Sequence, residues 1–600
     1  MGRTIGIGKQ DFEKVRMNHN FYVDKTHFIK EWWETDDDVT LITRPRRFGK
    51  TLNMSMLEKF FSVEYAGRGE LFEGLFIWEE KSLGRDEAHS GQISSGGEKN
   101  HGEENLADDG YKYRKLQGTW PVIALSFAKV KETSFWSTQK RICQIITELY
   151  NKFDFLVESG ILNENEKESY RKVSADMEDY IAADSLNALS NYLMRYYGKK
   201  VIILLDEYDT PMQEAYVNGY WKELVDFTRN LFNSTFKTNP YLERALMTGI
   251  TRVSKESIFS DLNNLEVVMT TSKKYEDCFG FTEEEVLAAL EEYKMSDFSQ
   301  QVKEWYDGFI FGKRKDIYNP WSIINFLDKK KVDAYWANTS SNSLVGKLIR
   351  EGNSDVKKTF EHLLQGESIP KEIDEQIVYD QLDDDGQAVW SLLLASGYLK
   401  VKNFRAYVTD FGEWKQEYEL ELTNFEVKVM FRKMVRKWFA GASSNYNDFI
   451  KALLLGDLKA MNTYMNRVTV EMFSYFDTGK GPSGDEPERF YHGFVLGLMV
   501  DLADRYVITS NRESGFGRYD MMLEPRKASG TNSFINDAVI IEFKVQDEEE
   551  RELADTVQDA LRQIEEKNYI ASLVARGIPE ERIRKYGFAF CGKKVLIGRA

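Results

Sequence analysis

Cysteine is scarce in this sequence, whose 600 residues include only Cys143, Cys278 and Cys591. The three residues stand far apart and show none of the spacings that are typical of zinc-binding or redox motifs. The sequence therefore argues against a disulfide-stabilised secreted fold, and we expect a protein of the reducing cytoplasm.

Long apolar runs are also missing. No segment approaches the roughly 18 consecutive apolar residues of a membrane span, so we expect no membrane partner. The N-terminal stretch MGRTIGIGKQDF lacks the apolar core that a signal peptide needs.

Positive charge is in deficit. The chain has 80 Lys and Arg residues against 97 Asp and Glu residues, which gives a formal net charge of −17. This balance argues against a generally basic surface for nucleic acid, but a local basic groove can exist within an acidic total.

The chain is too long for one hydrophobic core, and two to four domains are expected. The hydrophobic fraction of 42% and the aromatic fraction of 14% are ample for packed domains. Composition and periodicity divide the chain into an α/β segment, a Gly/Ser-rich insertion predicted to be disordered, a helical lid or connector region, a linker and a final α/β segment. The first α/β segment is 1–282 and contains the insertion at 81–115. The helical region is 283–477, the linker is 478–487 and the final α/β segment is 488–600. A β-hairpin is predicted at 404–423.

The stretch VTLITRPRRFGKTLNMSML predicts a buried strand, a basic loop and a helix. Gly49, Lys50 and Thr51 in the loop match the end of the pattern G-x-x-x-x-G-K-[ST]. At a helix N-terminus, the lysine would reach the phosphates of ATP and the hydroxyl would bind Mg²⁺. The first glycine of the pattern is Arg44 here, and Arg47 adds positive charge. A basic surface turn is the alternative interpretation.

The stretch VIILLDEYDTP predicts a buried parallel strand that ends in an acid. Asp206 at this strand end could hold Mg²⁺ beside Thr51, and Glu207 could polarise the attacking water. Thr248, at the end of a further predicted strand, could sense the γ-phosphate. Arg252 could do the same or act as an arginine finger, although a surface salt bridge is an equal alternative.

The final segment carries an acid in each of two predicted strands. Asp520 lies in RYVITSNRESGFGRYDMMLEP, and Glu542 and Lys544 lie in DAVIIEFKVQ. In a strand, Glu542 and Lys544 share one face. Two carboxylates that meet across paired strands form an oxygen site for Mg²⁺, and the lysine can orient or deprotonate the attacking water. A solvated strand face is the alternative.

Two sets of motifs resemble known families. NFYVDKT, LITRPRRFGKT, LLDEYDTP, TGITRVSKESIFSDLNN, WYDGF and IYNPWS resemble a family of predicted bacterial ATPases, the AAA-ATPase-like family. YHGFVLGLM, SNRESGFGRYD, IIEFK and QIEEKNY resemble the PD-(D/E)XK nuclease superfamily. The resemblance implies that Asp520, Glu542 and Lys544 form the nuclease motif, with Gln563 as the supporting glutamine. Tyr519 replaces the proline of the superfamily name.

The resemblance implies an α/β fold: a P-loop NTPase parallel sheet, a helical middle region and a C-terminal α/β PD-(D/E)XK nuclease-like domain. It implies ATP and Mg²⁺ as cofactors and nucleic acid as the partner, with DNA favoured over RNA, in bacterial defence or mobile-element biology. An alternative is a nucleotide-gated signalling or defence switch whose nuclease-like domain only binds nucleic acid or protein. The sequence leaves open whether the chain forms a homo-oligomer or binds a partner protein.

Overall fold

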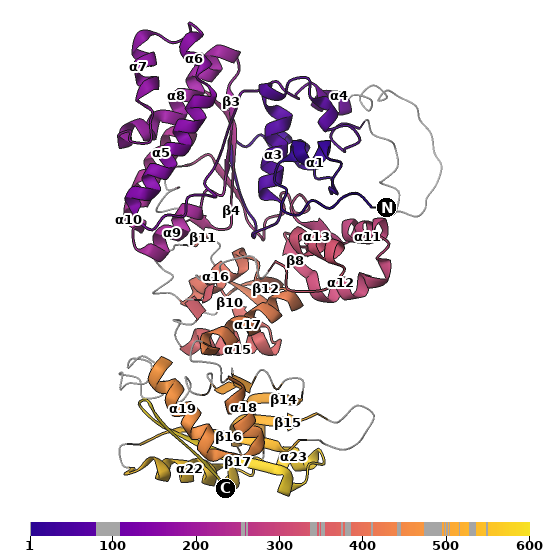
Figure 1. Cartoon of the computed structure of the whole chain (residues 1–600), viewed down its shortest axis with the longest axis vertical. Coiled ribbons are helices and arrows are strands. Elements are labelled where there is room, and N and C mark those ends of the chain that lie inside the picture. The colour runs from indigo at the N-terminus through magenta and orange to yellow at the C-terminus, as the bar shows by residue number, and fades with distance from the viewer. Residues whose placement is uncertain are drawn as a thin grey trace. The chain divides into compact units, whose positions relative to one another are not determined.

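The chain folds into two compact units (Figure 1), Met1–Leu348 with Gly366–Val427, and Ile349–Gln365 with Lys428–Ala600. The computed structural model describes residues 2–79, 109–253, 262–336, 354–373, 386–409, 412–440, 446–472, 505–514, 517–526, 536–547 and 550–600, with some single positions between these ranges. Within these residues, no helix has the length and apolar composition that crossing a bilayer requires.

The first unit is built on a five-stranded sheet in the order β2-β3-β4-β1-β6, in which every neighbouring pair is parallel. The strands are β1 (Val39–Thr43), β2 (Val122–Ser126), β3 (Val201–Asp206), β4 (Leu242–Gly249) and β6 (Leu265–Val268). Every residue of β1 and β3 is buried. The apolar runs of the sequence thus form central parallel strands, which are covered on both faces. The prediction of a parallel sheet is confirmed.

Helices cover both faces of this sheet. Figure 1 shows α3 on one side and α5, α8 and α10 on the other. The helices of this part are α1 (Phe12–Met17), α2 (His27–Glu34), α3 (Lys50–Phe61), α4 (Asp109–Arg114), α5 (Phe135–Lys152), α6 (Phe155–Glu158), α7 (Glu164–Lys172), α8 (Asp179–Tyr197), α9 (Thr210–Asn218) and α10 (Trp221–Phe232).

The segment predicted to be disordered lies partly outside the described residues, which resume at 109. Its last part forms α4, contrary to the prediction for these positions. Tyr113 explains the difference, because its ring is 3% exposed and its hydroxyl bonds to the carboxylate of Glu34. One buried aromatic residue anchors a short helix that aliphatic content alone does not predict.

The middle of the chain contains helices and two small antiparallel sheets. The helices are α11 (Glu283–Glu292), α12 (Ser299–Tyr306), α13 (Pro320–Lys329), α16 (Gly386–Ala395) and α17 (Phe425–Ala440). One sheet is β7-β9-β8 and the other is β10-β13-β12. Their strands are β7 (Phe281–Thr282), β8 (Asp307–Phe311), β9 (Arg314–Tyr318), β10 (Ile369–Lys371), β12 (Leu399–Val408) and β13 (Trp414–Leu422); β5 (Arg252–Val253) pairs separately with β11 (Gln376–Ile377). Pairing of β12 with β13 confirms the predicted hairpin.

The β8–β9 hairpin was not predicted from the sequence. Its turn includes Gly312 at φ +55°, a conformation that favours glycine. Phe309 and Phe311 of β8 lie with ring centroids 4.7 and 5.4 Å from that of Phe48. The hairpin therefore packs directly against the loop that precedes α3.

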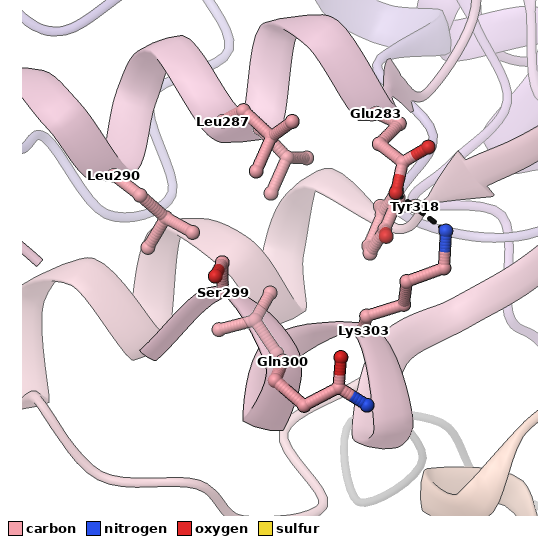
Figure 2. Close-up of a pocket in the computed structure, with 9 residues that line it drawn as sticks. Glu283, Leu287, Leu290, Ser299, Gln300, Lys303 and Tyr318 are labelled. Atoms are coloured by element: carbon pink, nitrogen blue, oxygen red, sulfur yellow. Dashed lines mark hydrogen bonds and ion pairs between the residues drawn. The ribbon is translucent and has the colours of Figure 1, made fainter. Parts of the chain in front are cut away.

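A shallow pocket lies between α11 and α12 (Figure 2). Leu287 and Leu290 line it, and an ion pair of 2.5 Å joins Lys303 Nζ to Glu283 Oε1 at one end. None of the predicted site residues lines this pocket.

The second unit has a mixed sheet in the order β14-β15-β16-β17-β18. Its strands are β14 (Tyr506–Ser514), β15 (Gly517–Pro525), β16 (Ala538–Val545), β17 (Ile583–Cys591) and β18 (Lys594–Arg599), and its helices are α15 (Ser354–Gln365), α18 (Tyr446–Leu455), α19 (Leu458–Met472), α22 (Leu553–Glu566) and α23 (Ala571–Ala575). β16 and β17 are parallel, and the other pairs are antiparallel. The α/β prediction for the C-terminus is confirmed.

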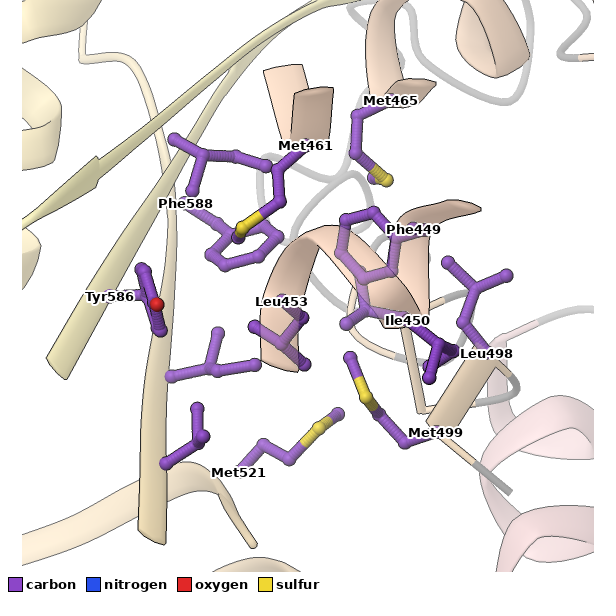
Figure 3. Packing of buried hydrophobic residues seen from close by; sticks show 14 of the residues in the cluster. Phe449, Ile450, Leu453, Met461, Met465, Leu498, Met499, Met521, Tyr586 and Phe588 are labelled. Carbon is purple, nitrogen blue, oxygen red and sulfur yellow. The ribbon is translucent and has the colours of Figure 1, made fainter. Parts of the chain in front are cut away.

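Apolar side chains cover both faces of this second sheet. Phe449, Leu453 and Met461 pack with Met521 and Phe588 on one face (Figure 3). The other face packs against α22 through a separate apolar cluster. Because β16 is buried on both faces, a carboxylate on this strand is costly unless another group pairs with it or hydrogen-bonds to it.

Candidate functional sites

The loop between β1 and α3 closes on a lysine. Gly49 has φ +82°, which suits glycine, and it precedes the first turn of α3. Lys50 Nζ donates hydrogen bonds of 2.8 Å to the carbonyl oxygens of Arg44 and Pro45. Burial lowers the pKa of Lys50. The ammonium is thus held inside the loop at a helix N-terminus, which is a suitable place for a phosphate.

The arginines of the loop point to different places. Arg44 is fully buried, donates a 2.9 Å hydrogen bond to the carbonyl of Met269 and lies 4.5 Å from the ring centroid of Phe311. It anchors the loop to the core, which accounts for the departure from the glycine pattern. The guanidinium of Arg47 lies 4.4 Å from the ring centroid of Trp321.

Asp206 joins the loop helix to two strands. Its Oδ2 accepts a 2.8 Å hydrogen bond from the Thr51 hydroxyl, and its Oδ1 accepts one of 2.6 Å from the Thr248 hydroxyl. Asp206 is 4% exposed, and this burial raises its pKa. Three residues selected from separate parts of the sequence therefore meet at the carboxyl end of the sheet.

Glu207 follows Asp206 with φ +50°, an unusual value for a residue with a side chain. Its backbone N–H donates to the Thr248 hydroxyl at 3.4 Å, and its carboxylate accepts from the Thr210 hydroxyl at 3.3 Å. Arg252 lies in β5, four residues beyond Thr248, where its strand pairs with β11.

Asp209 is a buried acid that the sequence analysis did not select. Its Oδ2 accepts hydrogen bonds of 2.9 Å from the backbone N–H groups of Ile250 and Thr251. Burial raises the pKa of Asp209. This acid ties the end of β3 to the end of β4, and the third acid of DEYDTP was the signal that could have identified it.

In the second unit, Asp520 and Glu542 lie on neighbouring strands. The Asp520 N–H donates to Glu542 Oε2 at 3.3 Å, and the Phe543 N–H donates to Asp520 Oδ2 at 2.8 Å. Glu542 is 3% exposed. The structure thus brings together the two carboxylates that were selected from the sequence.

Gln563 of α22 supports this pair. Its side-chain amide donates to Glu542 Oε1 and, at 3.2 Å, to the Tyr569 hydroxyl. Lys544 is half-buried, two residues beyond Glu542 in β16, so its side chain leaves the same face of the strand.

His492 is a second residue that the sequence analysis did not select. Its Nε2 lies 3.0 Å from the Asp520 carbonyl oxygen and 3.0 Å from the Ser510 hydroxyl. The ring is 8% exposed and lies 5.2 Å from the ring centroid of Phe543. The histidine in YHGFVLGLM was the available signal.

The donor atoms fit the expected cofactors. The first site offers a buried ammonium, a hydroxyl and a carboxylate at a helix N-terminus, which suits a magnesium nucleotide. The second offers carboxylate oxygens, one of them in a buried side chain, which suits Mg²⁺ bound through one or two carboxylates.

Comparisons with known proteins agree with this division. Residues 6–259 match the family described as Predicted AAA-ATPase, and residues 486–600 match the PD-(D/E)XK nuclease superfamily. The chain is also similar to a protein of Azotobacter chroococcum mcd 1 described as "Uncharacterized protein in vnfD 5'region". That protein is 23% identical over 598 residues, which cover 96% of this chain and 95% of the relative. Both resemblances drawn from the sequence motifs are confirmed.

Proposed function

We propose a cytoplasmic enzyme that hydrolyses ATP and cleaves nucleic acid, because residues 6–259 match the predicted AAA-ATPase family and residues 486–600 match the PD-(D/E)XK nuclease superfamily. The nuclease uses Mg²⁺, and DNA is the substrate to test before RNA. Bacterial defence or mobile-element biology is the proposed setting.

At the nucleotide site, Lys50 exchanges its two carbonyl partners for the β- and γ-phosphates of ATP. Thr51 and Asp206 hold the magnesium ion, which when bound neutralises phosphate charge. Glu207 orients the hydrolytic water. Thr248, already bonded to Asp206, senses the γ-phosphate, and Arg47 and Arg252 supply further positive charge.

At the nuclease site, Asp520 and Glu542 hold Mg²⁺, which when bound supplies Lewis acidity at the scissile phosphate. Lys544 orients or deprotonates the attacking water. Gln563 fixes the Glu542 carboxylate through its hydrogen bond to Oε1. The observation that carries the nuclease proposal is the convergence of Asp520 and Glu542, supported by Gln563, because a nucleic-acid-binding surface alone needs no such set.

The test uses the full chain with supercoiled plasmid DNA or labelled RNA, with and without Mg²⁺ and ATP. We expect magnesium-dependent cleavage that Asp520→Asn and Glu542→Gln each abolish. Glu524→Gln is the matched control, because Glu524 lies on the same strand as Asp520 but pairs with Arg576 instead. If either active-site variant still cleaves at the wild-type rate, the nuclease assignment is wrong. If wild type binds nucleic acid without cleaving it, the binding switch is the better description.

A further inference from the structure

A second group of ligand-type side chains lies in the first unit, apart from the residues assigned above. The four-residue cluster consists of His27, Glu31, Asp277 and Cys278. His27 and Glu31 are one turn apart on α2, so they share one face of this helix. Asp277 and Cys278 come from a segment some 250 residues later in the chain, between β6 and β7.

The ligand atoms of the cluster converge. One atom from each of the four side chains lies within 4.8 Å of all the others. His27 Nε2 is 3.3 Å from Asp277 Oδ1, and Cys278 Sγ is 3.6 Å from Glu31 Oε2 and 3.9 Å from Asp277 Oδ1. In a tetrahedral site with metal–ligand bonds of about 2.0–2.3 Å, neighbouring ligand atoms are about 3.3–3.8 Å apart. The three distances lie in or close to this range and the remaining pairs are no more than 4.8 Å apart, so a small contraction of the cluster would give the dimensions of such a site.

Two further features point to a ligand. The Nε2 atom of His27 is buried, and its partner is the Asp277 carboxylate of the same cluster, 3.3 Å away. Cys278 is fully buried, and its thiol points at the carboxylates of Glu31 and Asp277 and not only at apolar side chains. One thiol, one imidazole and two carboxylates form a mixed soft and hard donor set, which suits Zn²⁺ better than Mg²⁺.

We propose that the four-residue cluster binds one Zn²⁺ ion. The ion would fix the base of the loop between β1 and α3, residues 44–49, which we call the phosphate loop. The link to the loop is short. The Cys278 carbonyl accepts a 2.9 Å hydrogen bond from the Asn53 side chain in α3, and the Gly280 N–H donates to the Phe48 carbonyl at 3.3 Å. A zinc ion would hold this segment against α2 and thereby hold Phe48 and Asn53.

A lysine holds the backbone of the segment that carries Asp277 and Cys278. Lys25 Nζ donates 2.7 Å hydrogen bonds to the Asp277 carbonyl and to Glu285. Such outer contacts commonly fix the geometry of metal ligands. When zinc binds, the S–H bond of Cys278 breaks, an S–Zn bond forms and the proton passes to solvent.

The test measures metal content directly. The full chain is incubated with Zn²⁺, dialysed against metal-free buffer and analysed for zinc by atomic emission. We expect wild type to retain one zinc ion per chain. The zinc content should be at least tenfold lower in Cys278→Ser and in His27→Gln, and unchanged in Cys143→Ser. Cys143 is the matched control because it is also a buried thiol, 1% exposed, but lies outside the cluster.

Substitution with Co²⁺ gives a second measurement. A thiolate ligand produces charge-transfer absorption that wild type and Cys143→Ser should show and Cys278→Ser should lack. His27→Gln, at a partly exposed side chain, serves if Cys278→Ser fails to fold. Absence of bound zinc in wild type, or its retention in both cluster variants, would overturn the proposal. If the chain binds zinc at this cluster but does not bind ATP, the zinc site is confirmed and only the proposed nucleotide function is wrong.

Discussion

Replacement of Lys50 by methionine tests the nucleotide site most directly. Methionine keeps an unbranched apolar stem in the buried space and removes the ammonium, whose two carbonyl contacts are 2.8 Å long. If Lys50 transfers its hydrogen bonds from these carbonyls to the phosphates, the variant should bind ATP more weakly and hydrolyse it more slowly.

The expected size of the effect follows from the contacts. A hydrogen bond that involves a charged group contributes about 1.5–3 kcal/mol, which corresponds to an increase of about 10- to 150-fold in the dissociation constant for ATP. Stability should change less. The variant leaves two carbonyl groups without their ammonium partner, at a cost of about 1–3 kcal/mol. It also removes the cost of burying the ammonium, a cost that shows in the lowered pKa of Lys50. The variant should therefore fold.

Calorimetric titration with ATP and Mg²⁺ measures the affinity, and thermal unfolding checks the fold. Lys59→Met is the matched control, because Lys59 lies on the same helix, is 6% exposed and pairs with Glu58 at 3.0 Å. Equal ATP affinity in wild type and Lys50→Met would refute the assignment, and so would an equal loss in Lys59→Met.

Two further variants test a positioning contact and a buried acid. Gln563→Leu should reduce plasmid cleavage by about 10- to 100-fold with little change in melting temperature, because the hydrogen bond to Glu542 Oε1 is lost; unchanged cleavage would exclude a positioning role. Burial and the nearby Asp316 carboxylate raise the pKa of Asp307 to about 6, against about 3.9 in an unfolded chain. The folded state then holds an extra proton between these values, so wild type loses stability as the pH rises from about 4 through about 6. Asp307→Asn should avoid this loss. Because solvent screens the partly exposed side chain, we expect the variant to be only about 1 kcal/mol more stable than wild type at pH 7.5, and equally stable below pH 4. Denaturant titrations at both pH values measure the difference, and a variant less stable at pH 7.5 would contradict the argument.

The sheet and its acids could be predicted because their signals are local. An apolar run that ends in an acid places Asp206 at the carboxyl edge of a parallel sheet, and the loop before α3 places Thr51 at the same edge. Their 2.8 Å hydrogen bond follows from this rule, although 155 residues separate them. Glu542 could be selected from an apolar strand that carries an acid, whereas Gln563 depended on resemblance to a known motif, since neither periodicity nor charge identifies a glutamine on a helix as a partner.

Other features could not be read from the sequence because they depend on tertiary contacts. Arg44 looked like a charge in a basic loop, yet it is fully buried among backbone carbonyls. The aromatic strand of the β8–β9 hairpin resembled a connector until its packing on Phe48 was visible. Cys278 had no metal spacing with any other cysteine, because the imidazole and carboxylates beside it come from another part of the chain.

The phosphate loop is held at its base by three neighbouring strands or segments. The Arg44 N–H donates to the Gly249 carbonyl at 3.1 Å, Phe48 accepts from Gly280 and packs on the β8–β9 hairpin, and Asn53 bonds to Cys278. The two carbonyl oxygens that accept hydrogen bonds from Lys50 Nζ are partners that phosphate oxygens could replace one for one. If ATP binds as proposed, side chains such as Lys50 rearrange while these backbone and packing contacts at the base of the loop stay in place, which would keep the entropic cost of binding low. A substitution at the base should consequently impair ATP binding without touching the nucleotide, whereas Lys50→Met impairs it by direct loss of contact.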